Sequence, residues 1–169
     1  MFETIESYAR RTNHGPLISF IEGSQCLHDA LGIRTHDVLY DCASGELKAS
    51  LEVLPLHQGT AYGENSIMYG IVIAALADMA TGAATYLHAG PMRVVTHKET
   101  RIRYLRHVPI LAGSRLFIEI DVSKIRNRLR SHYCVGTVYQ ECLGTVHETA
   151  KVWAKIPSIL EKVFERLLR

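Results

Sequence analysis

A single acidic residue, Asp78, lies in the middle of the long apolar segment formed by residues 67–88. At about 1.5 Å per residue, a helix over this range would be about 33 Å long. It would be apolar on nearly every side, so other parts of the protein must cover it. A carboxylate in such surroundings is held by a partner or used in proton transfer or nucleophilic attack. Asp78 is therefore the first candidate for a catalytic residue.

A second set of candidates is a cluster of basic residues in a predicted hairpin tip, formed by Lys124, Arg126, Arg128 and Arg130. Arginine binds phosphate through paired hydrogen bonds, so Arg126 and Arg128 are candidate contacts for a phosphorylated ligand. A solvated hairpin tip would have the same composition. Nucleic acid is disfavoured as a partner, because Tyr133 is the only nearby aromatic residue and the net charge of the chain is +2.

The composition of the chain favours one domain that covers residues 1–169. Apolar residues make up 47% of the sequence, which is enough to form a core. The four cysteines show no Cys-x-x-Cys spacing, so we expect reduced thiols in a cytoplasmic protein and no metal site. Residues 1–8 have no apolar run and do not resemble a signal peptide.

The length of the 67–88 segment also fits a membrane span. Asp78 at its centre, two internal glycines and many alanines argue against that interpretation. We therefore expect a core helix, with no membrane as a partner.

Apolar periodicity predicts three further helices around this one. Two are expected over 2–12 and 17–31, within an N-terminal extension of residues 1–33. An amphipathic C-terminal helix is expected within residues 157–169.

Strands are predicted where apolar and polar residues alternate. The clearest cases are 46–54 and 114–123. The other predicted strands cover 38–43, 93–106 (one long strand or a bent one), 131–140 and 145–155, and a polar loop covers 55–66. A helix cannot lie within an antiparallel sheet, so the order predicts a two-layer α+β domain with the sheet wrapped around the long helix.

The order of elements and the residues of the long helix resemble the hotdog fold, and most closely the acyl-CoA thioesterases of the phenylacetate-pathway type. In that family the helix opens with His-Gly-Gly, and an acid within Leu-Ala-Asp follows nine residues after the His. This chain has Leu76-Ala77-Asp78 at that place and Tyr69-Gly70-Ile71 at the opening. It also has Tyr104-Leu105-Arg106-His107 where the family often has aromatic-Leu-Arg-Pro. The resemblance covers residues 35 to 155.

The resemblance implies hydrolysis of an acyl-CoA thioester to the free acid and CoA, with no cofactor apart from the CoA of the substrate. Asp78 would be the nucleophile or general base. The amides of Gly70 and Ile71 would stabilise the oxyanion at the positive end of the helix. Tyr69 replaces the family histidine and either donates its hydroxyl to the carbonyl or lines the site.

The same resemblance indicates three substrate-binding candidates. Thr96 and His97 fall at the strand position that faces the acid in the similar enzymes, although His97 also fits a half-exposed strand residue. Asn65 either caps the long helix or polarises a water molecule at the site.

The replaced histidine keeps a non-catalytic acyl-CoA-binding protein as an alternative. A dehydratase or hydratase ranks lower, because that branch of the fold requires Glu four residues after the glycine, where Ala74 stands.

Spacing along the helix predicts a site shared between subunits. Gly70 and Asp78 would lie about 12 Å apart along the axis, so one carbonyl group cannot touch both. Asp78 would therefore face Gly70 of another chain, in a homodimer or a dimer of dimers (a homotetramer). In the other interpretation, Asp78 only forms a hydrogen bond across a subunit interface.

Overall fold

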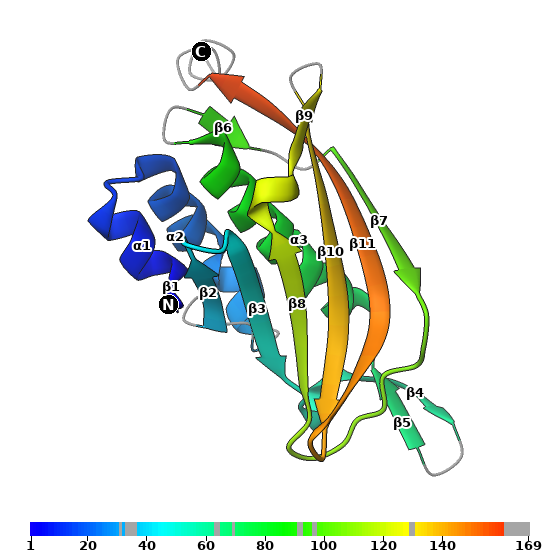
Figure 1. Ribbon diagram of the computed structural model, residues 1–169. Coiled ribbons are helices and arrows are strands. Elements are labelled where there is room, and N and C mark those ends of the chain that lie inside the picture. The colour runs from blue at the N-terminus through cyan, green and yellow to red at the C-terminus, as the bar shows by residue number, and fades with distance from the viewer. Residues whose placement is uncertain are drawn as a thin grey trace.

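A curved antiparallel sheet wraps around one long helix, α3 (Gly70–Ala89), in the computed structural model of the protein (Figure 1). The structure describes residues 1–30, 32, 37–62, 65–68, 70–90, 93–95, 98–128 and 131–160. The two-layer α+β arrangement agrees with the sequence-based prediction. Both layers are held by one core, in which apolar side chains of the sheet meet the buried sides of α3.

The main sheet runs in the order β1–β2–β3–β8–β10–β11. On the side away from β10, β11 pairs with β7 over residues 150–155 and with β6 over residues 158–160, and β9 pairs with the start of β10. The strands are β1 (Glu3–Thr4), β2 (Val38–Asp41), β3 (Glu46–Glu52), β6 (Arg93–Val95), β7 (Glu99–Tyr104), β8 (Arg115–Asp121), β9 (Arg126–Arg128), β10 (Ser131–Cys142) and β11 (Thr145–Leu160).

The predicted alternation decides which face of the sheet meets the helix. In β3 the buried residues are Leu47, Ala49 and Leu51, as expected. In β8 they are Leu116, Ile118 and Ile120, again as expected. Phe117 points to the outer face but is also buried, because the ring of Tyr139 stacks on it at 5.2 Å and the ammonium group of Lys48 lies 3.8 Å from its centre.

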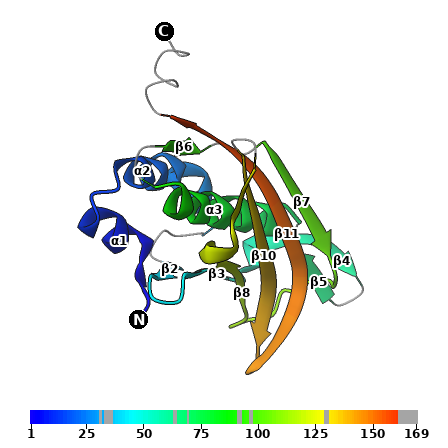
Figure 2. The same cartoon turned by 45° about the horizontal axis from the view of Figure 1, so that its top comes forward.

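The longest hairpin, between β10 and β11, closes through the two residues Leu143 and Gly144. Both have positive φ, at 49° and 75°, which is the backbone of a tight hairpin turn that matches the twist of the strands. One irregularity in the pairing between Val138 and Tyr139 bends the hairpin. The bend lets β10 and β11 curve around α3 (Figure 2).

The N-terminal extension forms two helices, α1 (Ile5–Arg11) and α2 (Gly15–Ala30). Both predicted helices are present, but the first begins at Ile5 and not at Phe2, because Glu3 and Thr4 pair with β2 as strand β1. α2 begins at Gly15, before Pro16, since proline is tolerated in the first turn of a helix. α2 lies along the C-terminal half of α3, as Figure 2 shows. The imidazole Nε2 of His14 is 3.1 Å from the carbonyl oxygen of Tyr86, whose ring is 5.2 Å from that of Phe20.

The predicted polar loop over 55–66 is wrong. A short 3₁₀ turn, η2 (Pro55–His57), leads into β4 (Gln58–Tyr62), which pairs with β5 (Asn65–Met68) in a second, two-stranded sheet. The long helix therefore begins at Gly70 and not at Ile67. The amide of Met68 donates to the carbonyl of Val108 at 2.9 Å, so the backbone at Met68 pairs as a strand and does not belong to the helix.

Two other predictions need correction. The predicted strand over 93–106 is divided into β6 and β7, with residues 96–97 outside the described part. The C-terminal helix predicted within 157–169 does not begin at Ser158, because Ser158, Ile159 and Leu160 continue β11 and pair with β6. The rest of that predicted helix lies outside the described residues.

α3 is long and apolar enough to cross a membrane by length and composition. However, 72% of its most apolar stretch is buried inside the protein, so packing against the sheet and α2 accounts for its composition.

Candidate functional site

The two halves of α3 differ in what covers them. Within the first half, Gly70, Ile71, Ala74, Ala75 and Asp78 are exposed or half-buried, and their spacing of three and four residues places them on one side of the helix. We call these five residues the open stripe. Ile71 is 66% exposed, which is unusual for isoleucine in the central helix of a domain. From Met79 to Tyr86 every residue is buried.

Tyr104, the last residue of β7, contacts the beginning of α3. Its hydroxyl donates to the carbonyl of Gly70 at 3.1 Å. A Cβ atom at position 70 would lie 2.9 Å from that hydroxyl oxygen, so any other residue there would push the tyrosine aside. Partial burial raises the pKa of Tyr104 above its usual value of 10.0, so the phenol keeps its proton at neutral pH.

This hydrogen bond acts on one of the proposed oxyanion donors. The carbonyl of Gly70 and the amide N–H of Ile71 belong to the same planar peptide group. A donor on the carbonyl side polarises the group and strengthens the N–H as a donor. In the first turn of a helix, that N–H has no acceptor within the helix. The start of α3 thus presents a polarised amide beside an exposed hydroxyl.

Asp78 lies on the open stripe two turns after Ile71, about 10.5 Å along the axis. Its side chain is exposed in a single chain, so the expectation that the helix is covered on every side is wrong for this half. The hydroxyl of Thr81 lies 3.4 Å from the backbone carbonyl of Asp78. The structure therefore places Gly70, Ile71 and Asp78 on one accessible surface, as the site prediction requires, but too far apart for one carbonyl group.

Three of the predicted site residues, Tyr69, Thr96 and His97, lie outside the described residues. The backbone of Asn65 is in β5, where it pairs with Tyr62. α3 begins at Gly70, so Asn65 is not at its N-cap position, and the other interpretation, that Asn65 polarises a water molecule, stays a prediction.

Arg126 and Arg128 lie elsewhere in the chain, on the outer face of the sheet. In β10 the buried His132 faces α3, where its ring is 5.4 Å from that of His88. Tyr133 points the other way, and Arg126 is its direct partner on β9. His88 is also at the opposite end of α3 from Gly70, about 27 Å along the axis. Within one chain, these arginines do not join the open stripe.

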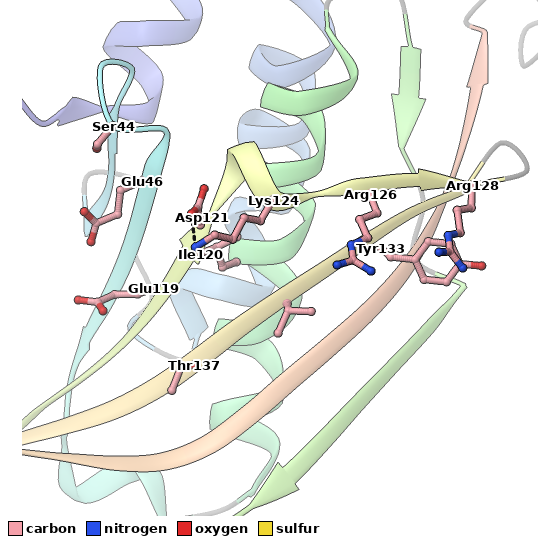
Figure 3. A pocket seen from close by; sticks show the side chains of 11 residues that line it. Ser44, Glu46, Glu119, Ile120, Asp121, Lys124, Arg126, Arg128, Tyr133 and Thr137 are labelled. Atoms are coloured by element: carbon pink, nitrogen blue, oxygen red, sulfur yellow. Dashed lines mark ion pairs between the residues drawn. The ribbon is translucent and has the colours of Figure 1, made fainter.

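The two arginines line a hollow of about 860 Å³ (Figure 3). Lys124 also lines the hollow and is 2.9 Å from the carboxylate of Asp121. Glu46 and Glu119 line the other end of the same hollow. Three members of the predicted basic cluster, Lys124, Arg126 and Arg128, thus line one hollow, and Arg130 lies outside the described residues. The acidic residues at the other end of the hollow were not predicted from the sequence.

Tyr104 was not predicted as a site residue. The signal for it was present in the sequence, because Tyr104 opens the Tyr-Leu-Arg stretch that resembles the family motif. What the motif did not show is that strand β7 ends beside the first turn of α3.

No protein-family model matches the sequence, and no curated protein matches it. Solved structures share its fold. A thioesterase family protein from Silicibacter pomeroyi is 15% identical over 85% of this chain and 98% of that chain, with a TM-score of 0.65. A mutant thioesterase from Pseudomonas aeruginosa is 18% identical over 83% of this chain and 91% of that one, with a TM-score of 0.60. A mutant acyl-CoA hydrolase from Staphylococcus aureus in complex with coenzyme A is 18% identical over 71% and 68%, with a TM-score of 0.56.

At these identities the likeness establishes the fold. The chain has the hotdog α+β fold, an antiparallel sheet around a long central helix, and the predicted fold class is confirmed. Its structural neighbours are thioesterases and acyl-CoA hydrolases. The phenylacetate-pathway type and the altered opening motif stay predictions.

Proposed function

We propose that this protein hydrolyses an acyl-CoA thioester to a free acid and CoA, at a site shared between two subunits. The observation that carries the proposal is the open stripe of α3, which presents Asp78 and the first-turn amides on one accessible surface beside Tyr104. The named activities of the structural neighbours support the choice of substrate, since one of them is an acyl-CoA hydrolase that holds coenzyme A.

The shared site follows from the length of the open stripe. A second copy packed on this stripe, related by a two-fold axis, would bring its own Asp78 to the start of α3 in the first. β7 belongs to the same surface, because Tyr104 on that strand contacts Gly70. Two such sites would form in each dimer.

The proposed reaction uses residues of both subunits. Asp78 of one subunit takes a proton from a water molecule, whose oxygen bonds to the thioester carbonyl carbon. The amides of Gly70 and Ile71 of the other subunit stabilise the oxyanion. The intermediate then collapses, the C–S bond breaks, and the proton on Asp78 passes to the CoA thiolate. Direct attack by the Asp78 carboxylate, followed by hydrolysis of the anhydride, gives the same products.

Further roles are proposed for the remaining candidates. Tyr69 would donate to the carbonyl group, while Thr96 and His97 would orient the water, with Asn65 nearby. Arg126 and Arg128 would contact the phosphates of CoA only if the assembly brings them within reach of the open stripe.

The test is a panel of acyl-CoA thioesters assayed by thiol release, with a no-substrate control for the exposed Cys42. Asp78→Asn should lower turnover at least about 100-fold, because it removes the base while keeping the shape of the side chain. Asp37→Asn, which precedes β2 near the opposite edge of the sheet from β7, is the matched control. Equal turnover by wild type and Asp78→Asn would exclude the proposed role of this residue.

Mixed dimers test the shared site. We expect Gly70→Val to be inactive because it displaces Tyr104 and blocks the helix start. Mixing it with Asp78→Asn creates heterodimers with one intact site, so about one quarter of wild-type activity should return. No recovery after mixing would place both groups of the site in one chain.

A non-catalytic acyl-CoA-binding protein is the second candidate, and the tyrosine at position 69 favours it, because the similar enzymes have histidine there. Tight binding of acyl-CoA without turnover in the same panel would support it.

A further inference from the structure

The outer face of the sheet, on the far side from α3, carries an exposed aromatic and cationic cluster. We call it the outer patch, and it consists of Arg101, Arg126, Tyr133, Val135, Trp153 and Lys155. The register brings them together from four strands. Trp153 of β11 stands directly between Arg101 of β7 and Val135 of β10. Two residues from Val135 on β10, on the same face, Tyr133 stands between Lys155 of β11 and Arg126 of β9.

The outer patch lines two adjoining hollows. The larger, of about 860 Å³, contains Arg126 and the nearby Arg128. The smaller, of about 660 Å³, contains Arg101, Trp153 and Lys155. Tyr133 and Val135 line both, so the hollows meet there. Each volume lies within the range of about 300–1,000 Å³ that is common for small-molecule sites.

A second aromatic cluster on the same face shows what makes the outer patch unusual. Phe117 and Tyr139 stack on each other, and Lys48 covers Phe117, which is only 6% exposed. Trp153, the only tryptophan in the chain, is 39% exposed, and its neighbour Val135 is 54% exposed. The sheet closes one aromatic cluster with its own side chains and leaves the other accessible.

The charges around the outer patch favour an anion. Arg101, Arg126 and Lys155 surround the two rings, and the ammonium group of Lys155 is 5.7 Å from the centre of Tyr133. In the smaller hollow Glu99 pairs with Arg101 at 2.6 Å, so these two charges offset each other and Arg126 and Lys155 are the cations left to attract an anion. A second copy of this face would bring like charges together, which disfavours self-association here.

We propose that the outer patch binds a nucleotide. Its phosphates would bind Arg126, Arg128 and Lys155, and its base would stack on Trp153, about 8 Å diagonally across the sheet from Tyr133. Glu46 and Glu119 line the opposite end of the larger hollow and repel phosphate, so they direct it toward the arginines. Two sources have this chemistry, a free nucleotide and the nucleotide end of CoA. The site does not depend on thioester hydrolysis, because the sheet separates it from the open stripe of the same chain.

The fluorescence of the single tryptophan reports on the patch directly. ATP, AMP, CoA and inorganic pyrophosphate are titrated into the wild-type protein while Trp153 emission is followed. We expect saturable quenching by ATP that weakens as salt is raised. Arg126→Ala/Arg128→Ala should raise the Kd for ATP at least about 10-fold. Arg115→Ala is the matched control, since this arginine is at the far end of β8 and lies 3.9 Å from Asp37.

Trp153→Phe, followed by calorimetry, should weaken ATP binding about 3- to 10-fold while leaving pyrophosphate binding unchanged, because only the base stacks on this ring. Failure of ATP to bind at millimolar concentration would overturn the proposal. So would equal losses in the Arg115 and Arg126/Arg128 variants, binding of pyrophosphate as tight as that of ATP, or binding of oligo(dT) in place of ATP.

Two further arms distinguish the sources. If the ligand is the nucleotide end of CoA, the double arginine variant raises KM for an acyl-CoA but not for the matching N-acetylcysteamine thioester, which lacks a nucleotide. If the ligand is a free nucleotide, the double arginine variant raises the Kd for ATP but leaves KM for the acyl-CoA unchanged. Either result supports a nucleotide site. Because the titration needs no turnover, it remains informative if the protein proves not to be a thioesterase.

Discussion

The first half of α3 (70–78) carries most of its large aliphatic residues and the second half (79–89) is rich in alanine and threonine, yet the second half is the more completely covered. From Met79 to Tyr86 every residue is buried, and the two threonine side chains there bond to the helix itself. The hydroxyls of Thr81 and Thr85 each donate to the carbonyl four residues earlier, at 2.7 Å. In the first half the open stripe remains accessible, and its acid and first-turn amides are exposed.

The difference separates the part of the helix that holds the fold from the part available for chemistry. The second half is covered by α2, an element of the N-terminal extension, on the side that the sheet leaves open. Within the described part of one chain, no such element covers the open stripe, and Ile71 is 66% exposed. A long apolar helix is therefore not evidence of uniform burial, and its uncovered side is where a partner or substrate fits.

The largest expected effect comes from enlarging an alanine in each half. Ala84 is fully buried, so Ala84→Leu should lower the free energy of unfolding by about 1–3 kcal/mol or more through overpacking. Ala74 is half-buried on the open stripe, and Ala74→Leu should change that free energy by less than about 0.5 kcal/mol. Instead, it should reduce turnover and self-association. Urea unfolding at low protein concentration, where a dimer would dissociate, measures both variants.

Equal destabilisation by the two leucines would show that the open stripe is packed within a single chain. The contrast between the two halves would then be lost, together with the reason for placing a site on the first.

Several elements of the fold could be predicted because local pattern decides them. The alternation in β3 and β8 identifies the residues that face the core, and the length of α3 identifies it as the central helix. The hairpin β4–β5 could not be predicted, because Gln58–Tyr62 has no alternation and its pairing depends on β5 and on the bond between Met68 and Val108. The strand ending at Leu160 was missed for a similar reason, since β6 supplies its partner from far away in sequence.

The candidate site divides in the same way. Asp78 and Gly70 could be named from their types and spacing, because both lie on one helix. Tyr104 and the outer patch required the register, which brings Arg101, Tyr133 and Trp153 onto adjacent strands. The exposure of Ile71 could not be predicted either, since no periodicity in the sequence distinguishes it from the buried Ile73.

A smaller effect is expected from removing the hydrogen bond between Tyr104 and Gly70 at the start of α3. Tyr104→Phe keeps the ring but removes the donor to Gly70, so kcat for thioester hydrolysis should fall about 3- to 10-fold, with KM unchanged, as for one hydrogen bond of about 0.5–1.5 kcal/mol. The amide proton of Ile71 should shift upfield in the NMR spectrum, with or without activity. Tyr139→Phe, whose ring stacks on Phe117 on the outer face, is the control.

The pH dependence sharpens this test. The raised pKa of Tyr104 keeps the phenol protonated at neutral pH, so its contribution is complete there and is lost as pH rises through that raised value. The ratio of wild-type to Tyr104→Phe activity should therefore decline toward one in strongly alkaline solution. A constant ratio, or an unmoved Ile71 signal, would mean that the hydroxyl does not act on this peptide group.

The smallest effect near neutral pH concerns the exclusion of solvent around the buried second half of α3. Cys134 lies on the inner face of β10, two residues from His132, whose ring meets that of His88 at the end of α3. Burial raises the pKa of Cys134 from 9.0 to about 12. The unfolded chain releases this proton at lower pH than the folded one, so stability is full below pH 9 and falls between the two pKa values, by about 1.4 kcal/mol per pH unit.

Urea unfolding of wild type and Cys134→Ala between pH 8 and pH 10.5 measures this term, because lysines and tyrosines that titrate in the same range affect both proteins alike. The alanine variant should be less stable at pH 8, since it leaves a small cavity, and the gap should narrow as pH rises. Parallel curves would indicate that water reaches the thiol. Solvent would then reach the inner face of β10 as it reaches the open stripe, and the contrast in burial between the two parts of α3 would be lost.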